Sequence, residues 1–333
     1  MKIIIPLILV ALFSAIAYFG VEKAGLQALF GIYIPYVAFL TFVIGFAARI
    51  LDWMKTPVPF NITTTAGQQK SLPWIKRQPL ENPSNFFEVV LRTLSEVLFF
   101  RSLFRNTEAK LEDGDLKYAS NKWLWFFGII FHWGFFLVAL RHFRFFLPSL
   151  PAPIMALEQM DSILQVGVPA LYQTDLLFIG GVTFLFFRRV VNPHMRYLSL
   201  VADFFPLMLI AGIGITGMLM RYLIRVDVMG IKALTMGLAT FSIPSGEHLA
   251  TLDPMFYTHL FLVSVLMAYF PFSKLMHMGG VFVTPSKVMA NDSRRKRHVS
   301  PWMYEVEPFS YSDYEDQYRD KMKDAGIPVE KEE

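Results

Sequence analysis

The chain contains no cysteine among its 333 residues. This absence excludes disulfide bonds, thiolate-held iron–sulfur clusters, cysteine-type zinc sites and covalently attached c-type haem on this chain. The sequence also has no HExxH motif, no internal repeat and no low-complexity tract. Any metal or redox chemistry on this chain must therefore use side chains other than cysteine.

Charged residues are also scarce. They make up 17% of the chain, against about 25% in an ordinary soluble domain, whereas hydrophobic residues make up 54%. The apolar residues are concentrated in six runs, at about 3–20, 28–48, 122–146, 163–187, 198–220 and 255–278. Each run can reach the ~20 residues that a helix needs to cross a bilayer. The fourth run contains Asp175 and is free of charge only from 176 to 187, so its start is not defined by the sequence.

These runs predict an all-α integral membrane protein, a bundle of about six transmembrane helices. If the first run were a cleaved signal peptide, five helices would remain. Eleven Lys and Arg residues lie in the 49–122 segment, and RRKR follows the last run at 294–297. Because positive charge is retained on the cytoplasmic side, we expect both termini to be cytoplasmic. The formal charge of +4 therefore reflects membrane topology rather than binding to nucleic acid.

The same pattern divides the chain into four parts. Residues 1–51 hold two transmembrane helices, and residues 52–121 form a cytoplasmic loop. Residues 122–285 form a four-helix core, and residues 286–333 form a cytoplasmic tail. Within the loop, segment 86–104 carries Glu88, Arg92, Glu96 and Arg101 on one helix face. We expect an amphipathic helix there, on the inner membrane surface or under a partner subunit.

Four of the seven histidines lie in the third and sixth runs. Ionisable side chains are costly inside a membrane and usually have a function there. His259 and His277 are eighteen residues apart, which is five helical turns, so they would share one face of a helix. His132 and His142 are ten residues apart in the antiparallel third run. This topology sets His142 opposite His259 on the outer side and His132 opposite His277 on the inner side.

Two histidines from two helices at one depth are the arrangement that holds a b-type haem by both axial positions. The rises differ, however, at ~15 Å for ten helical residues and ~27 Å for eighteen. A kink at Pro271 could absorb the difference. The alternatives are hydrogen bonding within the bundle and a non-haem metal site. Zinc usually takes tighter clusters and often carboxylates, and neither histidine-bearing run contains Asp or Glu.

Each of the other polar groups has more than one interpretation. Arg141 and Arg144 flank His142 and would anchor the membrane interface by snorkelling, pair with haem propionates or neighbour a quinone. Asp175 and Asp203 would be polar contacts or proton relays. The GIGITG stretch at 212–217 formally matches a dinucleotide-binding pattern, but it lies in an apolar run that follows no strand. Its glycines are better explained by close approach of a helix or a flat haem.

Two stretches carry a family resemblance, SNKWLWFFGIIFHWGFFLVALRHF and HLFLVSVLMAYFPFSKLMH. With their ten- and eighteen-residue histidine spacings, they resemble the gamma subunit of respiratory nitrate reductase over about residues 120–285. The resemblance implies two b-type haems, with His132, His142, His259 and His277 as axial ligands and a quinol site near His142. A lysine that the nitrate reductase subunit uses there has no counterpart, because the 145–175 loop contains no Lys.

The added first run, the long inner loop and the tail YSDYEDQYRDKMKDAGIP are similar to the DsrM proteins, the membrane cytochromes b of DsrMKJOP complexes. They also resemble subunits of heterodisulfide-reductase-like menaquinol-oxidising complexes. This likeness implies a prokaryotic cytoplasmic membrane and menaquinol or menaquinone as the diffusible substrate. It also implies a cytoplasmic iron–sulfur partner resembling DsrK, and subunits like DsrJ, DsrO and DsrP. The alternatives are a nitrate reductase gamma subunit, a proton-coupled transporter with histidines in its path, or a structural anchor.

Overall fold

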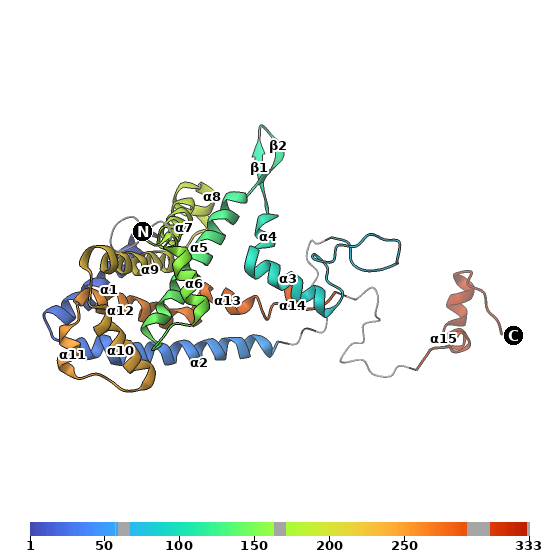
Figure 1. The fold of residues 1–333 in the computed structure, drawn as a ribbon. Helices are drawn as coiled ribbons and strands as arrows, with labels where there is room; N and C mark the ends of the chain where they lie inside the picture. Colours follow the sequence, from blue (N-terminus) through green and yellow to red (C-terminus); the bar gives the residue numbers. More distant parts are fainter. Residues whose placement is uncertain (57, 59–66, 163–170, 292–306, 332–333) are drawn as a thin grey trace.

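The computed structural model describes the chain except for residues 57, 59–66, 163–170, 292–306 and 332–333. Five helices in this part are long and apolar enough to cross a membrane. They are built on α1 Ile4–Glu22, α2 Ile34–Met54 with the preceding π-helical turn η1 Leu29–Tyr33, α5 Lys122–His142, α9 Val201–Met218 and α12 Pro254–Tyr269. Each coincides with one of the apolar runs. Figure 1 shows α12 running alongside α2, and α12 also packs against α1.

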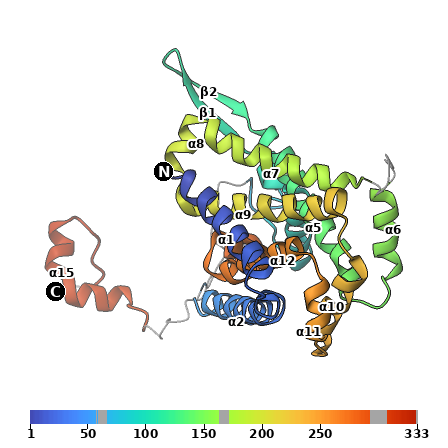
Figure 2. The ribbon, with the colours of Figure 1, turned by 90° about the vertical axis from the view of Figure 1, so that its left-hand side faces the viewer.

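A further helix, α7, covers Gln173–Val191 and corresponds to the fourth apolar run. It is not among the five apolar spans, since its 19 residues include Asp175, Arg188 and Arg189. It nevertheless packs along α5 on one side and α9 on the other (Figure 2). The expected start of this run at 163–170 lies outside the described residues.

The sixth apolar run departs from expectation. The helix α12 ends at Tyr269 and is followed by the 3₁₀ turns η4 Phe270–Phe272 and η5 Lys274–Met276, then by α13 His277–Gly280. Ser273 between the turns is extended, at φ −120° and ψ 174°. Pro271 has no N–H for the helical ladder and its ring disfavours helix before it. The prediction that His259 and His277 share one face of a continuous helix is therefore wrong.

Several elements were not expected. Strands β1 Thr107–Glu112 and β2 Asp115–Ser120 form an antiparallel hairpin, an exception to the all-α prediction. Its turn is Asp113-Gly114, with φ of 57° and 84°, the left-handed pair that a tight hairpin turn requires. The remaining short elements are η2 Phe143–Phe145, α6 Ala152–Asp161, α8 Pro193–Leu198, the π-helical η3 Leu219–Ile224, α10 Val228–Thr240, α11 Gly246–Thr251, α14 Pro285–Val288 and α15 Tyr311–Asp324.

The amphipathic segment forms two helices, α3 Phe86–Phe99 and α4 Arg101–Phe104. Phe100 separates them in a left-handed conformation, with φ of 49°. The charged side chains turn toward the rest of the chain, where Glu88 pairs with Arg77 at 2.6 Å. The Arg77 guanidinium lowers the pKa of Glu88 to about 2. On the other face, Phe86 and Phe87 are exposed, as expected of a helix at a membrane surface or under a partner.

Glycines set how closely the core helices approach. A Cβ on Gly214 would collide with Phe178 of α7, and a Cβ on Gly217 would lie 3.3 Å from the ring of His259. A Cβ on Gly181 would lie 2.8 Å from Cβ of Phe131 in α5. Side chains of α7, α9 and α12 pack together around Phe178, Leu209 and Leu262. The glycines of GIGITG therefore act in helix packing, as the sequence indicated.

Candidate functional site

The outer histidine pair joins the end of α5 to α12. The ring centroids of His142 and His259 are 6.3 Å apart and the ring planes differ by 12°. The inner pair joins the middle of α5 to the start of α13, where the centroids of His132 and His277 are 6.0 Å apart at 83°. These are the two pairs that an antiparallel arrangement predicts. That they hold haem iron stays a prediction.

Each of the four rings is oriented through its Nδ1 atom. Nδ1 of His132 lies 2.7 Å from the carbonyl of Gly128, and Nδ1 of His142 lies 2.7 Å from the carbonyl of Val138. Nδ1 of His277 lies 2.9 Å from the carbonyl of Lys274. A carbonyl oxygen can only accept, so each of these three Nδ1 atoms donates its proton. Nε2 is left with the lone pair that binds metal.

Nδ1 of His259 lies 2.9 Å from Oγ1 of Thr216. The Thr216 hydroxyl also lies within hydrogen-bond distance of the carbonyl of Gly212, to which it donates. Its oxygen can therefore accept the proton of His259 Nδ1, so His259 also presents Nε2 as a free ligand. Thr216 sits inside GIGITG, where the sequence analysis had considered only the glycines.

The spacing of the rings fits a shared iron. A metal–imidazole bond is about 2 Å long and a ring nitrogen lies about 1 Å from its own centroid, so two imidazoles on opposite sides of one iron have centroids about 6 Å apart. Both pairs have this separation. His132 and His142 are also exposed, although other helices pack around them. The residues present therefore fit two bis-histidine haem sites.

A buried network of charges lies beside His142. Arg141 pairs with Asp175 and lies 3.2 Å from Asp161, and Arg144 pairs with Glu158. The guanidinium of Arg141 also stacks on Tyr172, 3.8 Å from the ring centroid. Nε of Arg141 and Nε of Arg144 are buried without a hydrogen-bond partner among the described residues. These two N–H groups suit an acceptor oxygen such as a haem propionate or a quinone carbonyl.

The inner pair is braced by the amphipathic segment. The Phe100 ring meets the His132 ring edge-on, with centroids 4.9 Å apart. Indole N–H groups of Trp125 and Trp133 in α5 donate to the carbonyls of Phe99 and Leu98, at 2.7 and 3.0 Å. These contacts fix the junction of α3 and α4 against the inner histidines. These contacts were not predicted, because no sequence pattern indicates that Phe100 adopts a left-handed conformation.

Several other polar residues lie away from the histidine pairs or outside the described residues. Asp203 accepts a hydrogen bond from Lys274 at 2.6 Å, and Gln173 donates to the Met160 carbonyl at 3.4 Å. Glu247 is exposed on α11. His298 and the RRKR run lie outside the described residues. In the described part of the chain, no group of three or more His, Asp or Glu side chains could hold a metal ion.

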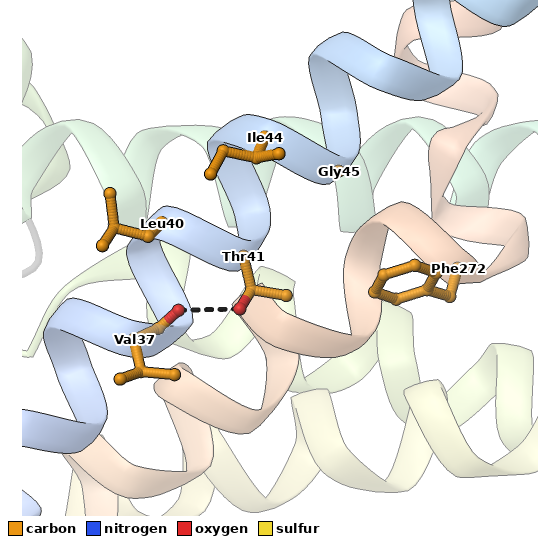
Figure 3. Close-up of a pocket in the computed structure, with 6 residues that line it drawn as sticks. All are labelled: Val37, Leu40, Thr41, Ile44, Gly45 and Phe272. Carbon is orange, nitrogen blue, oxygen red and sulfur yellow. Dashed lines mark hydrogen bonds between the residues drawn. The ribbon is translucent and has the colours of Figure 1, made fainter.

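A surface groove between α2 and η4 is apolar (Figure 3). It is lined by Val37, Leu40, Thr41, Ile44, Gly45 and Phe272. The hydroxyl of Thr41, its one polar side-chain group, already donates to the Val37 carbonyl at 2.8 Å. The groove therefore offers no directional contact to a polar ligand, and the histidine pairs remain the candidate site.

Comparison with known proteins agrees with this geometry. The family described as nitrate reductase gamma subunit matches residues 104–298, which include both histidine pairs. The chain belongs to the nitrate reductase gamma subunit family. It is also 44% identical over 278 residues to the Hdr-like menaquinol oxidoreductase cytochrome b-like subunit of Archaeoglobus fulgidus, covering 82% of this chain and 83% of that protein. The protein of the same description from Archaeoglobus profundus is 40% identical over 281 residues, 83% of either chain.

Family membership and the five apolar helices together make the chain a multi-pass membrane protein of redox type. The resemblance to the nitrate reductase gamma subunit and to heterodisulfide-reductase-like complexes is thus confirmed. Both Archaeoglobus relatives are described as subunits of an Hdr-like menaquinol oxidoreductase rather than as DsrM proteins. The family match begins at residue 104 and omits α1, α2 and α3, whereas the Archaeoglobus relatives match a larger share of the chain.

Proposed function

We propose that this chain is a membrane dihaem cytochrome b subunit that exchanges electrons between menaquinol or menaquinone and a cytoplasmic iron–sulfur protein. The observation that carries the proposal is the presence of two pairs of facing imidazoles, with ring centroids 6.0 and 6.3 Å apart. His142 and His259 would hold the outer haem, and His132 and His277 the inner one. α7 would be a sixth span, and an even number of spans would leave both termini on the same side of the membrane. The positive charge of the loops would make this the cytoplasmic side of a prokaryotic cell.

The chain's own residues would position this chemistry. When bound, haem supplies a one-electron couple at each pair, and the Nδ1 hydrogen bonds fix each imidazole with Nε2 inward. Ten residues of α5 separate His132 from His142, a rise of ~15 Å along the membrane normal. The two sites therefore carry electrons across much of the bilayer. The unpartnered N–H groups of Arg141 and Arg144 would receive a propionate or quinone oxygen at the outer side.

The electron acceptor must be another protein, since this chain has no cysteine to hold a cluster. By resemblance it is an iron–sulfur subunit like DsrK, in a complex with DsrJ-, DsrO- and DsrP-like subunits that serves sulfate or sulfur respiration. Phe100 connects the inner histidine to α3, whose exposed face includes Phe86 and Phe87. We propose this segment as the docking side. A gamma subunit of a nitrate reductase complex is the alternative assignment.

One observation bears on the transporter alternative. A proton-coupled transporter predicts broken helices, and α12 is broken after Tyr269. A histidine relay, however, needs both ring nitrogens to exchange protons. At His132, His142 and His277 the Nδ1 proton is committed to a backbone carbonyl. The break therefore fits positioning of His277 better than a transport path.

The test is haem stoichiometry. A dithionite-reduced minus oxidised spectrum and a pyridine haemochrome assay should give two non-covalent haems b per purified chain. His142→Ala or His259→Ala should remove one haem, and His132→Ala or His277→Ala the other. The matched control is His248→Ala, because His248 bonds to the Gly230 carbonyl at 3.0 Å outside both pairs and should leave two haems. Folded protein supplied with ample haem that binds none would sink the proposal.

A further inference from the structure

The charge network beside His142 contains three carboxylates that differ in how fully they are hydrogen-bonded. Asp161 accepts from the backbone N–H and the hydroxyl of Thr174, at 2.8 and 2.5 Å, and faces Arg141. Asp175 accepts from Arg141 and from the Tyr222 hydroxyl, the latter at 2.8 Å. Both aspartates thus accept a hydrogen bond on each of their oxygens.

Glu158, on α6, is different. The hydroxyl of Tyr172 donates to its Oε1 at 2.5 Å, and Arg144 pairs with the same oxygen. No hydrogen bond to Oε2 occurs among the described residues. The Glu158 side chain is 19% exposed, against 7% for Asp161 and 10% for Asp175. Among the described residues, Glu158 is therefore the carboxylate of the three that has an oxygen without a hydrogen bond and the largest exposed fraction.

Tyr172 connects Glu158 to the space beside His142. Its ring lies between two guanidiniums, with Arg141 at 3.8 Å and Arg221 at 4.0 Å from the ring centroid. Arg141, Arg144 and Asp175 are the charged groups close enough to act on His142. The Nε groups of Arg141 and Arg144 are buried and have no hydrogen-bond partner among the described residues, so both can donate to an oxygen of a ligand beside His142. A quinol hydrogen-bonded to these Nε groups would lie next to the hydrogen bond between Tyr172 and Glu158.

We propose that Glu158 is the proton acceptor for quinol oxidation, relayed by the hydroxyl of Tyr172. The inference rests on the proposed menaquinol reaction. Oxidation of one quinol to the quinone breaks two O–H bonds and releases two electrons and two protons. The two haems that the histidine pairs would hold, each a one-electron couple, would accept the two electrons. Each proton passes to the Tyr172 oxygen while the Tyr172 proton moves to Glu158, which then releases it to the outer aqueous phase.

The groups that face Glu158 come from several elements and support this role. Arg144 of η2 balances the carboxylate before it takes up a proton, and Tyr172 at the start of α7 is its donor. Asp161 on its own helix and Asp175 on α7 both face Arg141, and both oxygens of each carboxylate already accept hydrogen bonds from other groups of the described residues.

The experiment uses the full chain in its complex, in native membranes, with menadiol as the quinol. Stopped-flow reduction of haem b is followed across a range of pH. Glu158→Gln should slow reduction by about 10²-fold or more, since general acid–base groups contribute roughly 10²–10⁴-fold, and should change the pH profile. Tyr172→Phe, which keeps the ring between the arginines, should slow it similarly. Glu247→Gln, an exposed outer-side glutamate on α11, should match the unmodified protein.

A second readout follows the proton itself. The redox-difference infrared spectrum should contain a carboxylic-acid C=O band that shifts in D₂O and is absent in Glu158→Gln. The dithionite-reduced spectrum and haem midpoint potentials should be unchanged in both variants. Wild-type rates, pH profile and infrared band in Glu158→Gln would overturn the inference while leaving the proposed function standing. An unmodified complex that dithionite reduces but menadiol does not would overturn the proposed function and this inference with it.

Discussion

The crossing of α5 and α7 offers a sharp test of the fold around the inner histidine. Gly181 of α7 is buried against Phe131, the residue that precedes His132. A Cβ at position 181 would lie 2.8 Å from Cβ, 2.9 Å from Cα and 3.0 Å from N of Phe131. Carbon atoms pack at about 3.5–4.0 Å, so Gly181→Ala must separate the two backbones by roughly 0.7 Å or more. The obstructing atoms are mostly backbone and cannot rotate away.

The size of the effect can be isolated with the neighbouring glycine. Gly180 is exposed, and a Cβ there meets nothing within 4 Å. Both substitutions gain the same helix propensity, about 1 kcal/mol for Gly to Ala. The difference between Gly181→Ala and Gly180→Ala is therefore the overpacking cost, about 1–3 kcal/mol. We expect this difference in the free energy of unfolding, measured by reversible denaturation in mixed detergent micelles.

The same variant should affect the site. A displaced Phe131 moves His132, so, if the two histidine pairs hold haem as proposed, Gly181→Ala should alter the spectrum of the haem at His132 and leave that of the haem at His142 intact. Gly180→Ala should leave both unchanged. Equal stabilities for the two variants would show that α5 and α7 do not approach as closely as described, and would refute the reasoning.

Three further predictions concern segment 86–104 and the β1–β2 hairpin. The pKa of Glu88 is lowered to about 2, so the Glu88–Arg77 pair contributes its full stability above about pH 4.5 and loses it as the pH falls toward 2. The difference in the free energy of unfolding between wild type and Glu88→Gln should therefore shrink over that range. A difference that stays constant with pH would contradict this. Trp133→Phe should speed amide exchange at the end of α3 through loss of about 1 kcal/mol, whereas the exposed Trp123→Phe should not. Gly114→Ala should loosen the β1–β2 hairpin by about 1 kcal/mol in the same exchange measurement, because φ at Gly114 is +84°.

Much of this fold is predictable because the bilayer leaves few choices. An apolar run of membrane length can satisfy its backbone only as a helix, so α1, α2, α5, α9 and α12 follow directly from composition. α7 was expected from the fourth apolar run, although Asp175, Arg188 and Arg189 make it less apolar than the other five. The hairpin was missed although Asp113-Gly114 between polar strands is a strong turn signal.

The charged network was only partly predictable. Arg141 and Arg144 were chosen because they flank a histidine, and Asp175 because it interrupts an apolar run. Glu158 and Asp161 were not considered, since they lie in a loop without a clear helical period. Their spacing of three residues puts both on one face of α6, and that spacing could have indicated a shared partner.

The break in α12 explains how two histidine spacings that do not match can form two pairs. His132 and His142 lie ten residues apart on one helix, a rise of ~15 Å. From His259 the helix α12 runs ten residues to Tyr269, the same rise, and therefore reaches the depth of His132. The chain then leaves the helical path at Pro271 and Ser273, and the next turns carry His277 to within 6.0 Å of His132. A straight helix would have taken His277 about 12 Å further along the helix axis. The proline is thus what makes an eighteen-residue spacing compatible with a ten-residue one.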